Sequence, residues 1–431
     1  MVALIIGFSI SGRACSELLL SHGKQVLAVD RKAAALSTEL SVQVLLEKGV
    51  HLIDETVSID WSTIEQLLIS PGISPSHPHV QAAQLRGIEI VGEIELAFRH
   101  LKNPCIGITG TNGKTTATLL LAHILNSSGK KARALGNIGA ALSSYAIAPD
   151  SEEILVVELS SFQLETLQSK CLDCAVCINI TPDHLDRYAS MLGYAKAKCQ
   201  IENCLKEGAS LHVSKQIMEE YGSLLRHPTV FDAEPVPSSI APICPMRYIQ
   251  SGLPEMQNVQ AVYPLCRHFG VSDEAFFSAL KTFRKPKHRI EYVGEWMGLT
   301  FYNDSKATNI DAVMHAVALM DGPIALLAGG VDKGASYRPW VASFGSKVQR
   351  IVAFGQAAEK MERELKESFA FERVDGLGDA LASAVRGAKS PMKILLSPGC
   401  SSFDQFRNYE ERGNEFKRMV EEKVWIEKER S

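Results

Sequence analysis

The sequence predicts an α/β protein made of three α/β domains, and three observations support this. The chain has 431 residues, which is too long for one ordinary hydrophobic core. Strand-like and helix-like segments alternate along it. One strand leads into a glycine-rich turn that opens a helix. We expect a Rossmann-like N-terminal domain at residues 1–95, a central domain with a mostly parallel sheet at 96–284, and a Rossmann-like C-terminal domain at 285–431.

Composition and charge limit the class of protein. A formal charge of -4 gives no electrostatic reason to expect nucleic acid or an anionic membrane as a partner. The apolar run Val2–Ile6 has no basic segment before it and no cleavage site after it, unlike a signal peptide. No apolar stretch is long enough to span a bilayer. We expect a cytoplasmic protein that acts as a monomer, without nucleic acid and without membrane insertion.

Ten cysteines are scattered along the chain without a framework, which favours reduced thiols. Cys171, Cys174 and Cys177 are spaced like a metal site. They run into a strand pattern, however, which would point Cys174 and Cys177 to opposite faces. Buried thiols are therefore the favoured interpretation.

The N-terminal domain begins with a strand at Ala3–Ile6, a helix at Gly12–His22 and a second strand at Gln25–Asp30 that ends in a carboxylate. This is the order of a dinucleotide-binding unit. Its glycine fingerprint is incomplete, because Ser9 stands where the second glycine belongs. The turn does not predict an NAD enzyme, but its hydroxyls and backbone donors suit a pyrophosphate.

The central domain opens with the segment Cys105–Thr116, which predicts a P-loop-type ATPase domain. An apolar strand leads into the turn, and the helical segment Ala117–Asn126 follows it. Backbone N–H groups of such a turn converge on phosphate oxygens, and the helix N-terminus adds its positive end. Lys114 can bridge two phosphates, and a threonine hydroxyl can ligate Mg²⁺. Ile108 replaces the first glycine of the standard spacing, so an ordinary glycine turn before a helix is the alternative.

Polar side chains follow the next two strands. Glu158 ends the apolar run Ile154–Glu158, where a second Mg²⁺ ligand is expected beside a P-loop; a charge that simply emerges from a core strand is the alternative. The following strand ends in the segment Asn179–Arg187, which brings Asp183 and His184 to the same edge of the sheet. Lys198 lies on a helix expected at 192–205, where the residues alone favour a solvent-exposed face.

The remaining chain predicts a connection and a third domain. Residues 235–254 are proline-rich and read as a surface connection, and 257–283 look helical. Beyond a hinge at 284–289, strands and helices alternate again. Three polar loops follow predicted strands, so they could face one cleft. They are Asn303–Asn309, Gly329–Gly334 and Ser397–Phe406.

Taken together, four motifs are similar to those of the Mur ligases, and the resemblance covers essentially the whole chain. They are Thr109–Thr115, Glu158 with Ser160–Gln163, Asp183-His-x-Asp-Arg187, and Tyr194-x-x-Ala-Lys198. The loop Asn303–Asn309 and the block that ends in Arg412-Gly413 resemble the branch that adds D-glutamate. The Asp-Asn-Pro-Arg motif of the diaminopimelate- and lysine-adding relatives is absent.

The resemblance implies an ATP-dependent amide ligase of peptidoglycan precursor synthesis, which adds D-glutamate to UDP-N-acetylmuramoyl-L-alanine through an acyl phosphate. It also implies ATP and two Mg²⁺ ions as cofactors and a CO₂-derived carbamate on Lys198. Ligation of another amino acid, or folate-type glutamate ligation, is the alternative within the enzymes. A binding protein that uses ATP as a switch is the alternative from another class.

The resemblance assigns roles to individual residues. Catalysis is implied for Lys114, Lys198, His184 and Glu158. Metal binding is implied for Thr115, Thr116, Glu158, His184 and Lys198. ATP contacts are implied for Gly110, Thr111, Asn112, Gly113, Lys114, Thr115, Thr116, Asn258, Arg289, Asp304 and Lys306. Contacts with the UDP substrate are implied for Ser9, Ile10, Ser11, Asp30, Arg31, Gly72 and Asn137. D-Glutamate contacts are implied for Thr308, Lys333, Ser402 and Tyr409.

Three positions depart from the family pattern. Tyr409 stands where the D-glutamate pocket commonly has Phe. Gln257 and Ala261 replace a His and an Asn of the usual His-Asn-x-x-Asn segment, which leaves Asn258. The pair Arg31-Lys32 can be aligned with the family's uracil loop in two ways.

Overall fold

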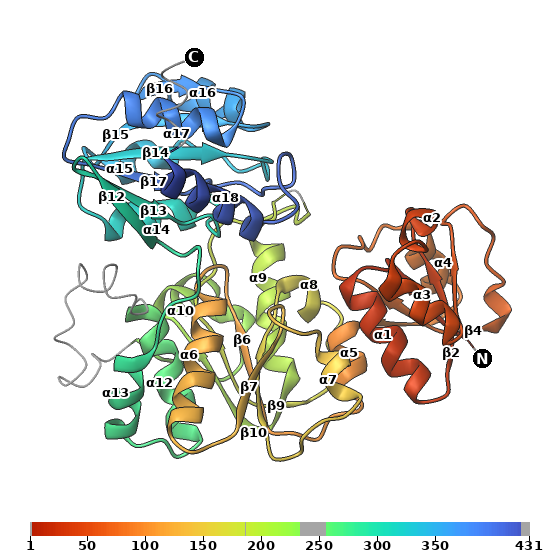
Figure 1. Cartoon of the computed structure of the whole chain (residues 1–431). Helices are drawn as coiled ribbons and strands as arrows, with labels where there is room; N and C mark the ends of the chain where they lie inside the picture. Colours follow the sequence, from red (N-terminus) through yellow and green to blue (C-terminus); the bar gives the residue numbers. More distant parts are fainter. Residues whose placement is uncertain (1, 186, 233–255, 424–431) are drawn as a thin grey trace. The chain divides into compact units, whose positions relative to one another are not determined.

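The computed structural model describes residues 2–185, 187–232 and 256–423. The proline-rich connection expected at 235–254 lies outside these residues. Described residues of 2–179, 195–232 and 257–279 form one compact unit, and those of 180–194 and 280–423 belong to a second. The first unit contains two sheets and the second contains one (Figure 1). Among the described residues, no helix combines the length and the apolar character needed to cross a membrane.

The N-terminal sheet has five parallel strands in the order β3-β2-β1-β4-β5. Its strands are β1 (Val2–Ile6), β2 (Gln25–Val29), β3 (Val50–Ile53), β4 (Ile64–Ile69) and β5 (Glu89–Gly92). Its helices are α1 (Ile10–Ser21), α2 (Ala33–Leu36), α3 (Leu40–Glu47), α4 (Pro78–Leu85) and α5 (Glu93–Phe98). The strand order reverses between β1 and β4, which is where open α/β sheets bind ligands.

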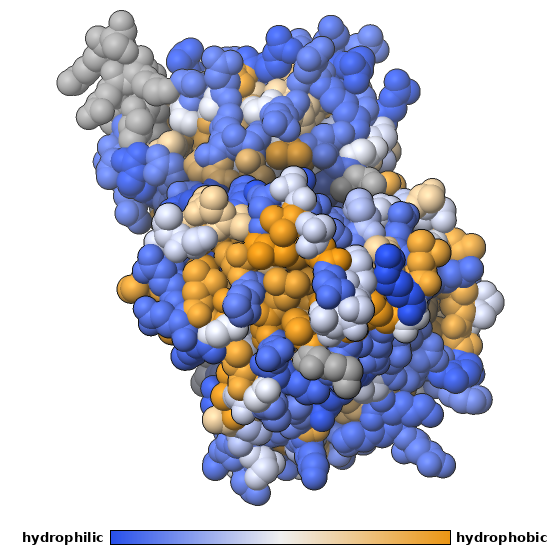
Figure 2. Space-filling view, turned by 90° about the vertical axis from the view of Figure 1, so that its right-hand side faces the viewer, coloured by the Kyte–Doolittle hydropathy of each residue, from blue (hydrophilic) through white to orange (hydrophobic). Residues whose placement is uncertain are grey.

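One face of this sheet is incompletely covered. A buried cluster that includes Leu4, Val29 and Leu67 packs against Val80 of α4, while Leu27 and Ile90 stay only partly buried. Figure 2 likewise shows apolar side chains gathered among polar ones on the surface that it presents.

The central sheet has six parallel strands in the order β11-β10-β9-β6-β8-β7. Its strands are β6 (Cys105–Thr109), β7 (Ala132–Gly136), β8 (Ile154–Glu158), β9 (Leu172–Cys177), β10 (Leu205–Val213) and β11 (Pro228–Val230). Its helices are α6 (Lys114–Ser127), α7 (Leu142–Ala146), α8 (Ser161–Leu164), α10 (Lys215–Tyr221), α12 (Met256–His268) and α13 (Asp273–Thr282). Because β6 lies between β8 and β9, the chain after β6 is flanked by the ends of both neighbours.

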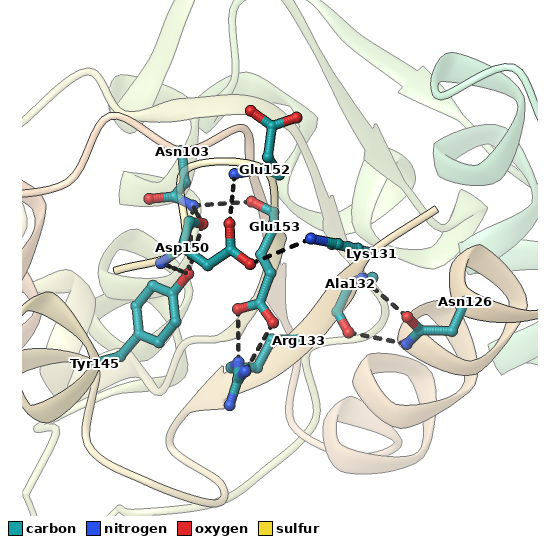
Figure 3. A network of polar contacts seen from close by, with 9 residues as sticks. All are labelled: Asn103, Asn126, Lys131, Ala132, Arg133, Tyr145, Asp150, Glu152 and Glu153. Carbon is teal, nitrogen blue, oxygen red and sulfur yellow. Dashed lines mark hydrogen bonds and ion pairs between the residues drawn. The ribbon is translucent and has the colours of Figure 1, made fainter. Parts of the chain in front are cut away.

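A network of polar contacts lies at the amino ends of β6, β7 and β8, the end of the central sheet opposite to the glycine-rich turn (Figure 3). The Asn103 amide donates to the backbone oxygens of Asp150 at 2.8 Å and Glu153 at 2.9 Å. Arg133 makes two bonds of 2.7 Å to the Glu153 carboxylate, and Tyr145 donates to Asp150 O at 3.0 Å. These contacts fix the amino ends of the strands, away from the glycine-rich turn.

The C-terminal sheet is mixed and has the order β12-β13-β17-β14-β15-β16. Its strands are β12 (Glu291–Trp296), β13 (Leu299–Asn303), β14 (Ile324–Gly329), β15 (Val348–Phe354), β16 (Ala370–Arg373) and β17 (Met392–Leu396). Its helices are α14 (Ile310–Leu319), α15 (Pro339–Phe344), α16 (Ala358–Leu365), α17 (Leu377–Arg386) and α18 (Tyr409–Glu422). Only β12 pairs antiparallel with its neighbour.

Both faces of this sheet are buried, as expected for strands covered by helices on each side. Leu326 and Ala328 of β14 join one core cluster, whereas Ala325 and Leu327 join the other. This alternation follows the two-residue period of a strand.

The elements differ from the sequence expectations mainly at their ends. The helical stretch expected at 257–283 is two helices, α12 and α13, separated at Gly270, whose φ is +72°. The helix expected at 192–205 is α9 (Met191–Cys199), followed by a 3₁₀ turn at Gln200–Cys204. A left-handed glycine ends a helix readily, and 3₁₀ turns commonly tighten the last turn of one.

Candidate active site

The glycine-rich turn after β6 has a left-handed backbone and a close side chain at Gly113. Gly113 caps α6 with a φ of +85°, and a Cβ there would lie 2.3 Å from Oδ1 of the Asn258 side chain. The positive φ favours glycine at this position. Lys114, the first residue of α6, donates from Nζ to the backbone oxygens of Gly110 and Thr111, both at 2.9 Å. Thr115 and Thr116 lie in the first turn of α6. The N–H groups of a first helical turn have no partner within the helix, so they can bind an anion at this end of α6.

Asn179, which the sequence interpretation did not assign to the site, holds this turn from the neighbouring strand. Its Oδ1 accepts the N–H groups of Thr111 at 3.1 Å and Asn112 at 2.8 Å. Its Nδ2 donates to Oε1 of Gln257 at 3.1 Å, and Nε2 of Gln257 donates to Ile178 O at 3.4 Å. Gln257, one of the departures from the family pattern, thus orients the amide that fixes the turn.

Lys198 is buried rather than solvent-exposed. Its side chain is 1% exposed, and its Nζ donates to Gly110 O at 2.7 Å. The same carbonyl oxygen accepts from Lys114. The Nζ atoms of both lysines therefore approach one acceptor.

Glu158 lies at the end of β8 with one oxygen satisfied and one not. Oε1 accepts from Nδ2 of Asn137 at 3.0 Å, and Asn137 N donates to Glu158 O at 2.9 Å. The residue is 2% exposed, and within the described residues Oε2 has no hydrogen-bond partner. A buried carboxylate oxygen without a donor suits a hard cation such as Mg²⁺. Within the same residues, no three His, Cys, Asp or Glu side chains form a metal cluster.

The loop after β9 belongs to the second unit. Asp183 accepts from Nζ of Lys333 at 3.0 Å and from Nδ2 of Asn309 at 3.1 Å. Burial alone would raise the pKa of Asp183, but the Lys333 ammonium, His184 and the hydrogen bonds hold it below its ordinary value. His184 has a φ of +55°, which is uncommon outside glycine and typical of functional loops. Asp186 lies outside the described residues.

The three polar loops of the C-terminal sheet leave adjacent strands. β13, β17 and β14 are neighbours and run parallel, so the loops that follow them emerge at one edge. Thr308 precedes the α14 N-cap residue Asn309, and Ser402 is buried. This placement agrees with the expected strands, and the cleft that the three loops could face stays a prediction.

Asp304 in the first of these loops is fully engaged. Its Oδ1 accepts from Ile290 N at 3.2 Å and its Oδ2 from the Ser397 hydroxyl at 2.8 Å. Burial raises the pKa of Asp304 to about 7, against the opposing effects of Ser397, Lys285 and Arg289.

Lys306 and His288 both contact the aromatic ring of Tyr409. Nζ of Lys306 lies 3.7 Å from the centre of the Tyr409 ring, a cation–π contact. His288 meets the same ring edge-on at 6.2 Å between centroids. His288 and Ile290 have φ values of +64° and +50°, so Arg289 sits between two strained residues.

The turn after β1 is equally tight. A Cβ at Gly12 would lie 2.2 Å from Gly7 O, and Ser9 and Ile10 cap and begin α1, followed by Ser11. Asp30 uses both carboxylate oxygens to accept the N–H groups of Phe8 and Lys32, each at 2.8 Å.

Arg31 and Gly72 occupy the loops after β2 and β4. The Arg31 side chain is 85% exposed, with Nε 3.5 Å from Oε2 of Glu55. Gly72 is exposed. The turn after β1 and the Gly72 loop flank the reversal of strand order, so an elongated anionic ligand could lie across it.

The fold and the glycine-rich turn define an α/β protein of the nucleotide-binding class, and polar loops also follow strands of its two other sheets. Family models match the chain in three successive parts: the Mur ligase MurD-like N-terminal domain at residues 2–92, the Mur ligase middle domain at 108–224, and the Mur ligase glutamate ligase domain at 288–400. The chain belongs to the Mur ligase family.

Individual relatives support the family and the fold. The chain is 44% identical to the UDP-N-acetylmuramoylalanine--D-glutamate ligase of Protochlamydia amoebophila, with 97% of each chain covered. It is 36% identical to the ligase of the same name from Caldanaerobacter subterraneus, covering 96% of this chain and 97% of that one. The crystal structure of the MurF ligase of Thermotoga maritima with ADP has a TM-score of 0.59 at 13% identity, covering 93% of this chain and 96% of that one.

Proposed function

We propose that this protein is an ATP-dependent ligase that joins D-glutamate to UDP-N-acetylmuramoyl-L-alanine in peptidoglycan precursor synthesis. The observation that carries the proposal is the edge of the C-terminal sheet, where adjacent strands supply Thr308, Lys333 and Ser402. One ammonium group and two hydroxyls suit an amino acid with two carboxylates. The names of the relatives at 44% and 36% identity support this choice of substrates.

In this proposal each domain binds one principal substrate, and the UDP substrate and ATP each receive contacts from a second domain. Residues 1–95 bind the UDP group through Ser9, Ile10, Ser11, Asp30, Arg31 and Gly72, and Asn137 of the next domain contacts the muramoyl-alanine part. Residues 96–284 bind ATP through Gly110–Thr116 and Asn258. Residues 285–431 add Arg289, Asp304 and Lys306 to the nucleotide and bind D-glutamate with Thr308, Lys333, Ser402 and Tyr409. The protein acts as a cytoplasmic monomer, without nucleic acid or membrane insertion.

The reaction has two steps. The substrate carboxylate oxygen attacks the γ-phosphorus of ATP, so that an acyl phosphate forms and ADP leaves. The D-glutamate amine then attacks the acyl carbon, an amide bond forms, and phosphate leaves with its bonding electrons. Lys114 and the N–H groups at the α6 N-terminus neutralise phosphate charge, while Asn179 keeps the turn in place. Lys333 and the two hydroxyls orient the amine for attack.

The proposal includes two Mg²⁺ ions, and the buried Glu158 oxygen that has no hydrogen-bond partner among the described residues supports one of them. Thr115 or Thr116 would hold the nucleotide-bound ion, and Glu158, His184 and Lys198 the other. Mg²⁺ supplies charge neutralisation between carboxylate and triphosphate. Lys198 would serve as a carbamate, formed when neutral Nζ bonds to the carbon of CO₂ and a proton is lost. This change replaces two cations at Gly110 O by a cation and an anion.

The test is release of phosphate in mixtures that contain ATP, UDP-N-acetylmuramoyl-L-alanine and an amino acid. We expect release only when all three are present, and with D-glutamate in preference to L-glutamate, lysine or diaminopimelate. Release that is indifferent to the amino acid would contradict the ligase. A clear preference for another amino acid would keep the ligase and overturn its assigned substrate.

A further inference from the structure

Arg412 is a buried guanidinium at the centre of the C-terminal domain. It lies one turn into α18 and is 0% exposed. Its Nε donates to Ser305 Oγ at 2.9 Å and its Nη2 to Ser305 O at 2.8 Å. Both Nη atoms donate to Cys400 O at 3.2 Å, and Nη1 also reaches Gly329 O at 3.4 Å.

The three residues that accept these bonds, Ser305, Cys400 and Gly329, lie in or directly before the three polar loops of this domain. Ser305 lies between Asp304 and Lys306 in the loop after β13. Gly329 ends β14, directly before the loop that carries Lys333. Cys400 is in the loop after β17, two residues before Ser402. One side chain therefore bonds to each of the three polar loops that follow β13, β14 and β17.

The chemistry of arginine suits this role better than that of any other residue. Its planar group presents five N–H donors in a fixed fork, whereas lysine offers one charged point. Within the described residues its hydrogen-bond acceptors are a hydroxyl and three carbonyl groups, with no carboxylate among them. A buried charge held only by neutral groups is disfavoured by desolvation, and burial indeed lowers the pKa of Arg412 to about 10. Packing alone would be served as well by an apolar side chain.

We propose that Arg412 is a positioning residue that holds the three ligand loops in one arrangement, so that binding of the amino acid depends on it. Tyr409 lies on the same helix one turn earlier, and its backbone oxygen accepts from Ser305 Oγ at 2.9 Å. The helix α18 therefore carries both the Tyr409 ring and the Arg412 side chain that contacts the loops. The inference rests on the proposed function, because that function assigns D-glutamate to these loops.

The test compares Arg412→Met and Arg412→Lys with Arg418→Met. Arg418 lies on the same helix but is half-exposed and paired with Glu415 and Glu422, so it is a matched control. We expect Arg412→Met to raise KM for D-glutamate roughly tenfold to a hundredfold, the effect of a small misplacement of binding groups. KM for the UDP substrate should not change. Arg412→Lys should lie between wild type and Arg412→Met, and Arg418→Met should match wild type.

Two further measurements keep the inference testable if Arg412→Met does not fold. Ser305→Ala removes one acceptor without a buried cavity of comparable size and should raise the same KM. Methylguanidine should partly restore Arg412→Ala, because it can occupy the vacated position. Folded variants with an unchanged KM for D-glutamate, or equal changes in every KM, would overturn the proposal. Lys333→Ala separates the two ideas: if it leaves KM for D-glutamate unchanged, the site assignment itself fails.

Discussion

Two lysines show how surroundings decide the chemistry of a residue. Lys114 and Lys198 come from different helices, yet both donate to the carbonyl oxygen of Gly110. Lys114 begins α6 beside the glycine-rich turn, whereas Lys198 is almost completely buried. The proposed function therefore gives phosphate binding to Lys114 and the carbamate to Lys198.

The first prediction concerns the proposed carbamate on Lys198. Lys198→Ala should lower the ligation rate by about a hundredfold or more, the usual effect of removing one electrostatic contact from an active site. A small carboxylate such as formate should restore part of the rate, since it can supply the missing oxygen ligands. Phosphate release with and without formate measures this, and Lys196→Ala is the control on the same helix. Equal activity of Lys198→Ala and wild type would contradict the role.

The second prediction concerns Gln257. Gln257→Ala should raise KM for ATP roughly tenfold, a typical effect of losing a partner that orients a binding group. Gln257→His should retain most of the affinity, because a ring nitrogen can take over one of the two bonds. Initial rates over a range of ATP concentrations decide the matter, with Gln260→Ala on α12 as the control. An unchanged KM in Gln257→Ala would mean that Asn179 keeps its orientation unaided.

The third prediction concerns pH. With a pKa of about 7, Asp304 loses its charge as the pH falls through neutrality, and a carboxylate accepts hydrogen bonds better than a carboxylic acid. KM for ATP should therefore rise as the pH falls from about 8 to about 6. Asp304→Asn has no such group to titrate, so its profile should lack this component. The same dependence of KM for ATP on pH in wild type and in Asp304→Asn would contradict a role of Asp304 in this dependence.

At the scale of elements, the sequence predicts strands that have an apolar run and does not predict a strand without one. The strands β6, β8, β13 and β14 were expected from apolar runs, and each ends in a polar loop where parallel strands require it. The strand β12 is not predicted from the sequence, because it carries Glu291 and Glu295 and lacks a clear alternation of apolar and polar residues. In the structure, a tight turn at Met297 and Gly298, with φ values of +48° and +74°, pairs β12 with β13.

The fourth prediction concerns α5 and the loop after α8. Glu95 accepts from the N–H groups of Gln168 and Ser169, both at 2.9 Å. Burial opposes its charge, yet these bonds and Arg99 together lower its pKa. A lowered folded-state pKa contributes stability above the unfolded value of about 4.3, and this contribution is lost as the pH falls below it.

Glu95→Gln should accordingly lower the free energy of unfolding by about 1–3 kcal/mol at neutral pH. The difference from wild type should shrink as the pH falls from about 5 towards 3. Thermal unfolding across this range measures it, and Glu89→Gln removes the more exposed partner of the same arginine as a control. A difference that stays constant with pH would contradict the role of the ionised carboxylate.

At the scale of the whole molecule, the sequence motifs identify candidate ligand-binding residues but not the residues that support them. Lys114, Glu158 and Lys198 stand in short contiguous patterns, so the sequence identifies them. Asn179 and Arg412 act through partners that are distant in sequence, at positions set by the neighbours of β6 and of β17. No local pattern contains that information, because it depends on which strands lie side by side.

The fifth prediction concerns the division of labour among the domains. Arg31→Ala should raise KM for the UDP substrate while leaving KM for D-glutamate unchanged, and Lys333→Ala should do the reverse. Each loss removes one charged contact, which typically changes binding by about 1.5–3 kcal/mol. Lys32→Ala decides between the two alignments of the uracil loop. Equal effects of Arg31→Ala on both constants would argue against separate binding domains.

The unpaired oxygen of Glu158 has a consequence beyond catalysis. A buried acceptor without a donor weakens a fold by roughly 1–3 kcal/mol, and an ion that binds the folded state restores stability by mass action. Folding of this protein would then be linked to the supply of divalent metal. Chelating buffers would then lower the temperature at which the protein unfolds.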